Sequence, residues 1–71
     1  MSNPEGRATL FYRVDLFESG VLTGIEFFDA AELAAAKTRA IAAVTDGGTH
    51  RAEVRDDAEG VVFHFPEVAQ P

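Results

Sequence analysis

The chain has 71 residues, and its twelve acidic and six basic side chains give it a formal net charge of −6 at pH 7. It contains no cysteine, which excludes disulfides, thiolate metal sites and a cysteine nucleophile. A chain of this length forms one domain whose core rarely supplies more than about 3–5 kcal/mol, so association with itself or another protein is the expected source of extra stability.

The first expected element is a β-strand in which apolar and polar residues alternate with period two, from Leu10 to Phe17. The polar residues before it predict a disordered tail over residues 1–8. Ser19 and Gly20 then predict a tight turn, because glycine supplies the positive φ that such turns need. Val21 to Phe28 is expected to form the second strand of a hairpin.

The register of this hairpin follows from the length of its turn. A two-residue turn sorts the apolar residues of both strands onto one face. The apolar pairs are then Val14 with Ile25, Tyr12 with Phe27, and Leu16 with Thr23. On the other face the opposite charges of Arg13 and Glu26 meet. A three-residue loop would move Glu26 to the apolar face, where an unpaired carboxylate costs several kcal/mol, so we expect the even turn.

A helix is expected next, from Ala30 to about Thr45. Asp29 is a good N-cap, and Glu32 three residues later completes a capping box. Gly47 and Gly48 end the helix. The residues predicted to share its buried face are Leu33, Ala36, Ala40, Ile41 and Val44.

Lys37 falls within that helix face and has two interpretations. It is either a rim residue whose stem covers apolar surface or a desolvated lysine that binds an anion or takes part in catalysis. No serine, cysteine or histidine lies at helical spacing to work with it. We therefore expect a rim residue.

A second hairpin is expected from Arg51 to Asp56 and from Val61 to Phe65, around an acidic turn. Pro66 ends its last strand, because proline cannot donate to a strand ladder. Residues 67–71 are expected to form a second disordered tail. An even loop gives the pairs Val54 with Phe63 and Ala52 with Phe65 on one face, and Glu53 with His64 and Arg55 with Val62 on the other.

These elements predict one small α+β domain over residues 9–66. Its fold is ββαββ, a four-stranded, mostly antiparallel sheet with one helix packed on one face. Strand order stays open, because a fully antiparallel sheet needs either the first strand beside the third or the second beside the fourth.

The sequence offers few groups for catalysis or metal binding. An EF-hand with its glycine at Gly60 would need an acid where Arg55 stands and a bidentate glutamate where Pro66 stands, so the acidic turn is interpreted as solvated. His64 opposite Glu53 is either a surface ion pair or part of an acid–base dyad, and it lacks a nucleophile. We expect no catalytic residues, no metal, no cofactor and no enzyme activity.

The face of the sheet that the helix leaves uncovered is the predicted interaction surface. Its expected residues are Phe11, Phe17, Leu22, Val62, Arg13, Glu26, Glu53 and His64. The predicted function is a non-enzymatic protein-interaction module, either a homodimer or the acidic partner of another protein. The alternative is a small-molecule or metal-binding accessory domain that uses Glu53, His64 and neighbouring acids.

Composition also bears on partners and location. The six basic residues are scattered among acids, so a nucleic-acid or anionic-membrane partner is not expected. No apolar run reaches the length of a membrane span, and the first seven residues lack the apolar region of a signal peptide. We therefore expect a cytoplasmic protein.

Two resemblances accompany these observations. The hairpin–helix–hairpin plan, with an aromatic first strand at Phe11-Tyr12 and a closing hairpin around Glu59-Gly60, resembles small acidic bacterial proteins of unknown function. That resemblance implies no activity and no site. The first hairpin and the Ala-rich helix are also similar to HicB-type antitoxins, which carry a third strand before the helix; no such strand fits here.

Overall fold

Four strands and one helix follow one another in the order ββαββ, which confirms the predicted α+β fold. The computed structural model describes residues 9–66, and the two expected tails lie outside that range. The elements are β1 (Phe11–Glu18), β2 (Val21–Asp29), the 3-10 turn η1 (Ala30–Glu32), α1 (Leu33–Asp46), β3 (Arg51–Asp56) and β4 (Val61–Phe65).

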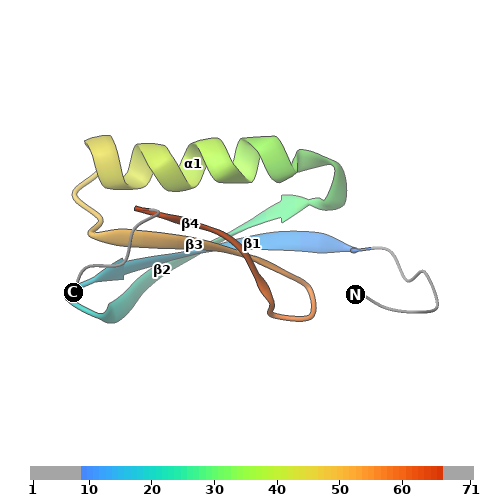
Figure 1. Ribbon diagram of the computed structural model, residues 1–71, viewed down its shortest axis with the longest axis horizontal. Helices are drawn as coiled ribbons and strands as arrows, with labels where there is room; N and C mark the ends of the chain where they lie inside the picture. Colours follow the sequence, from blue (N-terminus) through green and yellow to red (C-terminus); the bar gives the residue numbers. More distant parts are fainter. Residues whose placement is uncertain (1–8, 67–71) are drawn as a thin grey trace.

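The strands form one antiparallel sheet in the order β2-β1-β3-β4. The helix lies across one face of this sheet (Figure 1). Of the two strand orders that the sequence left open, the chain adopts the one with the first strand beside the third. As a result β1 and β3 are central, and β2 and β4 are the two edges.

The first hairpin has the predicted two-residue turn. Ser19 (φ 52°) and Gly20 (φ 80°) both have positive φ, as in the type I′ turns that suit the twist of hairpins. Glu18 accordingly lies opposite Val21 at the mouth of the turn.

Beyond the turn the predicted register is wrong, because β2 contains a bulge. Leu16 lies opposite Gly24 rather than Thr23, so Thr23 is an extra residue in β2. The Thr23 hydroxyl donates to the carbonyl oxygen of Leu16 at 3.3 Å. Since side chains alternate between faces, the one-residue slip moves Ile25 and Phe27 away from the helix.

The same slip moves Glu26 to the helix side, where it lies opposite Val14 rather than Arg13. Its carboxylate is not unpaired there. The Arg39 guanidinium of α1 donates from Nε and Nη2 to the two Glu26 oxygens, both at 2.8 Å. The sequence predicted that Glu26 avoids this face, because an unpaired carboxylate is costly to bury. That prediction is wrong because the helix supplies a partner for the carboxylate.

The helix begins as its capping signals predict, but its first turn is the 3-10 turn η1 rather than α-helix. The Asp29 N–H donates to Glu32 Oε1 at 3.0 Å, and the capping box is complete. At the other end, the N–H groups of Gly47 and Thr49 both donate to the Ala43 carbonyl oxygen at 3.1 Å. α1 therefore ends at Asp46.

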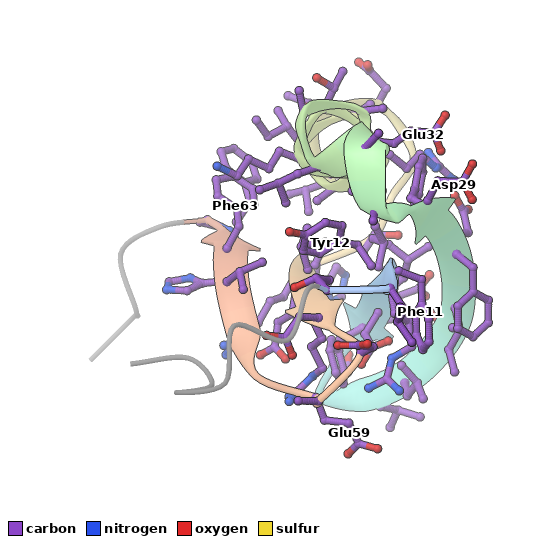
Figure 2. The ribbon with its side chains drawn as sticks, turned by 90° about the vertical axis from the view of Figure 1, so that its right-hand side faces the viewer. Phe11, Tyr12, Asp29, Glu32, Glu59 and Phe63 are labelled. Atoms are coloured by element: carbon purple, nitrogen blue, oxygen red, sulfur yellow. The ribbon has the colours of Figure 1, made fainter. Side chains whose placement is uncertain are left out.

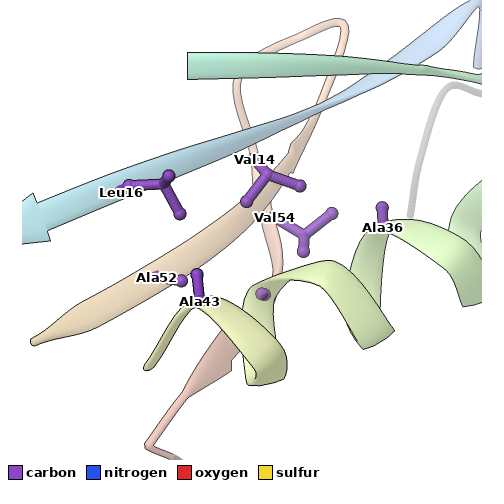
Figure 3. Close-up of a cluster of buried hydrophobic side chains, with 7 residues drawn as sticks. Val14, Leu16, Ala36, Ala43, Ala52 and Val54 are labelled. Atoms are coloured by element: carbon purple, nitrogen blue, oxygen red, sulfur yellow. The ribbon is translucent and has the colours of Figure 1, made fainter. Parts of the chain in front are cut away.

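Small side chains fill the core between α1 and the sheet (Figure 3). Ala43 is buried on the helix, whereas Ile41, which was expected there, is 38% exposed. Lys37 lies at the rim as predicted, with its Nζ 5.6 Å from the ring centroid of Phe63. The buried apolar residues are Val14, Leu16, Ala36, Ala40, Ala43, Ala52 and Val54.

The second hairpin keeps most of its predicted register. Val54 lies opposite Phe63, Ala52 opposite Phe65, and Glu53 opposite His64. A second bulge places Arg55 opposite Val61 rather than Val62. The acidic turn is closed by Asp56, whose Oδ1 accepts the N–H groups of Ala58 at 3.0 Å and Gly60 at 2.9 Å.

Candidate interaction surface

The face of the sheet opposite α1, here called the open face, is covered by no other described element. Figure 2 shows Tyr12 pointing toward the helix and its neighbour Phe11 lying on the other side of the sheet. Alternation along the strands places seven of the eight predicted surface residues on the open face: Phe11, Phe17, Leu22, Val62, Arg13, Glu53 and His64. Glu26 is the exception, because it lies on the helix side.

An apolar stripe runs along the β2 side of the open face and consists of Phe11, Leu22, Ile25 and Phe27. The rings of Phe11 and Phe27 meet edge to face, with centroids 5.8 Å apart. Phe27 is 66% exposed and Ile25 is 46% exposed. Sequence reasoning assigned these two residues to the buried face, although Gly24 inside the strand is a recognised signal of a bulge.

A ladder of charged side chains occupies the middle of the open face. The Arg13 guanidinium donates to both oxygens of Asp15, at 2.7 and 3.1 Å. Arg55 approaches the same carboxylate with Nε at 3.3 Å and donates to Glu53 Oε1 at 2.8 Å. Arg51 completes the ladder at 2.6 Å from Glu53 Oε2. Each carboxylate is thus held between two arginines.

Burial within this charge ladder is uneven. The side chains of Asp15 and Glu53 are 6% and 10% exposed, whereas Arg51 is 52% exposed. The other two arginines are about a quarter exposed. With three arginines against two carboxylates, the charge that reaches solvent in the middle of this face is positive, although the chain as a whole is acidic.

Glu53 and His64 lie opposite each other on β3 and β4, as predicted, but their side chains do not bind each other. Glu53 is engaged by its two arginines. The His64 Nδ1 donates to the carbonyl oxygen of Pro66 at 3.0 Å. Within residues 9–66, no group of three or more histidine and carboxylate side chains is placed to hold a metal ion.

A shallow pocket of about 210 Å³ lies at the turn end of the open face. The His50 Nδ1 accepts the N–H of Ser19 at 3.0 Å, so the neutral ring carries its proton on Nε2. The residues that line the pocket are Phe17, Gly20, His50, Arg51 and Glu53. Nothing in the sequence indicated this pocket, because β3 and the first turn are far apart along the chain.

Comparison with known protein families, with curated protein sequences and with solved structures finds no match to this chain. In the part of the chain that the structure describes, no helix has the length and apolar character needed to cross a membrane.

Proposed function

We propose that the chain is a non-enzymatic protein-interaction module that acts as a homodimer, with the apolar stripe buried between two copies. The observation that carries this proposal is the distribution of apolar side chains. Among residues 9–66, seven apolar residues are buried, four of them alanines, whereas nine large apolar residues are exposed. All four residues of the stripe belong to the exposed set.

The physical reason is the small size of the core. Full burial of a Val, Leu, Ile or Phe side chain is worth about 1.5–3 kcal/mol, and alanine contributes far less. Within residues 9–66, Val14 and Val54 are the largest side chains that are fully buried. A second copy that covers the stripe adds large apolar side chains to the buried set, and a two-fold axis uses every contact twice.

The distribution of charges on the open face favours a second copy over a basic protein as the partner. A basic partner would require an acidic docking face, but Asp15 and Glu53 are buried beneath their arginines. The stripe is apolar and lies on the β2 side of the open face, beside the charge ladder. We therefore assign association to the stripe.

Sedimentation velocity over a range from micromolar to millimolar protein tests this proposal. We expect a monomer–dimer equilibrium for the natural sequence and a monomer for Phe27→Asp, because a charge would replace the most exposed ring of the stripe. Ile41→Asp on the outer side of α1 is the matched control and should leave the dimer intact. A monomer at every concentration would refute the homodimer.

A second candidate, the small-molecule-binding accessory domain, has support from the pocket at the first turn. The Nε2–H of His50 and the exposed guanidinium of Arg51 are donors beside the ring of Phe17, a combination that suits a small carboxylate. NMR titration with benzoate should shift the signals of His50 and Gly20 in a saturable manner. Unchanged signals at millimolar benzoate would reject this candidate.

The expected cytoplasmic location and the absence of a nucleic-acid partner stay predictions.

A further inference from the structure

We infer that the two copies join through their β2 edges, which pair antiparallel and merge the two four-stranded sheets into one. This inference rests on the proposed homodimer and specifies its geometry. It requires that β2, rather than the centre of the open face or the β4 edge, carries the contact.

The β2 strand has the properties of an edge that pairs. It is the outer strand on its side of the sheet and has nine residues, against five in β4 at the other edge. An outer strand leaves every second N–H and C=O without a partner in the sheet. Natural edges are usually protected by lysine, proline or inward-pointing charges. β2 contains no lysine and no proline.

The charges of β2 do not protect its edge either. Glu26 points to the helix side, where Arg39 neutralises it through two hydrogen bonds. Asp29 lies at the end of the strand and forms the helix cap. The apolar side chains of the strand, Leu22, Ile25 and Phe27, are all more than two-fifths exposed. The one protective feature is the bulge at Thr23, which lies near the turn and leaves the segment after Gly24 regular.

The charge ladder argues against stacking the two open faces on their centres. Such a stack would bring the half-exposed guanidinium of Arg51 and the partly exposed ones of Arg13 and Arg55 toward the same groups of the second copy. Like charges brought together at an interface repel each other and weaken it. Pairing at the β2 edges brings the stripe side chains of β2 in the two copies beside each other across the new strand pair, and it keeps the two ladders on opposite sides of the axis.

Symmetry restricts the register of such a pair. In an antiparallel pair with a two-fold axis perpendicular to the sheet, the residue at the axis faces its own copy. An axis at Glu26 would oppose two carboxylates, which is unfavourable. An axis at Ile25 uses the whole length of β2, and one at Phe27 uses the regular segment that follows the bulge. Both registers set Ile25 and Phe27 of the two copies beside each other on the open face, and we place the axis at one of these two residues.

Matched charge substitutions test where the contact lies. Ile25→Lys places a charge on the β2 edge and should weaken the dimer by at least about tenfold, which equals about 1.4 kcal/mol. Val62→Lys is the control, because Val62 is 43% exposed against 46% for Ile25 and lies beside the other edge of the open face. Circular dichroism confirms that each variant is folded. A dimer that resists Ile25→Lys and dissociates with Val62→Lys would overturn the inference and leave the homodimer standing.

Single-cysteine variants then locate the axis, and the natural absence of cysteine makes the result unambiguous. Directly opposed residues have Cα atoms about 4.5–5.5 Å apart, which suits a disulfide. We expect rapid oxidation to a covalent dimer for either Ile25→Cys or Phe27→Cys, and none for Val62→Cys. If sedimentation shows a dimer but neither β2 cysteine cross-links, the β2 pairing is wrong. If the protein is monomeric, the homodimer fails together with it.

Discussion

Arg39 on the helix and Glu26 on the edge strand form a two-pronged ion pair, with both nitrogen–oxygen distances at 2.8 Å. This pair connects α1 to β2, which is an edge strand of the sheet. It also lets Glu26 occupy the helix side of the sheet, and with Glu26 in that position alternation sends Ile25 and Phe27 to the open face. The ion pair and the apolar stripe are therefore consequences of one register.

The Glu26–Arg39 pair predicts a stability that depends on pH in the acid range. The hydrogen bond from Arg39 lowers the pKa of the Glu26 carboxyl below its ordinary value of 4.5, with the guanidinium charge adding to this and partial burial opposing it. Because the folded-state pKa is the lower one, the contribution is present above about pH 4.5 and is lost as the pH falls through the folded value.

Glu26→Gln should therefore lower the free energy of unfolding at neutral pH by less than about 1 kcal/mol, since both side chains are more than a third exposed. The difference from the natural sequence should shrink toward zero as the pH falls well below 4.5. Urea unfolding at several pH values measures it. Arg39→Met should flatten the pH dependence in the same way, and a constant difference across the range would contradict the assignment.

Substitutions at the two ends of the helix should change the free energy of unfolding in opposite directions. Asp29→Ala removes the side chain of the capping box and should lower the free energy of unfolding by about 0.5–2 kcal/mol. Asp46 lies in the last turn, where a negative charge opposes the helix dipole. Asp46→Ala should raise stability by about 0.3–1 kcal/mol. Denaturation midpoints at unchanged slope decide both, and equal signs would show that the helix ends are misplaced.

Substitutions at the two residues of the first turn should also change stability in opposite directions. Gly20 has φ 80° and open space where a Cβ would lie, so Gly20→Ala should cost about 1–2 kcal/mol through backbone strain alone. Ser19 also has positive φ, and type I′ turns prefer asparagine at that position. Ser19→Asn should raise the melting temperature. Gly60→Ala, where the glycine φ is not positive, is the control and should cost less than Gly20→Ala.

Removing a side chain of the charge ladder should lower the free energy of unfolding more when that side chain is more deeply buried. Asp15→Ala leaves Arg13 and Arg55 without their shared carboxylate and should cost up to about 3–5 kcal/mol. Arg51→Ala should cost less than about 1 kcal/mol, because that side chain is half exposed. The double variant Arg13→Met with Asp15→Leu should recover part of the loss, since an apolar pair needs no charged partner. Chemical denaturation of the three proteins tests the order, and similar costs for the first two would contradict it.

Local signals in the sequence were sufficient to identify the elements. The alternation in β1, the Ser19-Gly20 turn, the Asp29/Glu32 capping box and the second hairpin all appear where they were predicted. Each of these signals acts within a few residues, so it depends little on the rest of the fold. The same holds for the apolar pairs of the second hairpin, which lie before its bulge.

What the tertiary structure decided is which side chains face outward on β2. Binary patterning favoured Glu26 outward and Ile25 inward, and the bulge at Thr23 reverses both. The reversal is stable because Arg39, on a different element, neutralises Glu26, and no pattern within the hairpin contains that partner. The energy of a charged group depends on what surrounds it in space, so the open face and its apolar stripe are set only once the helix has packed on the sheet.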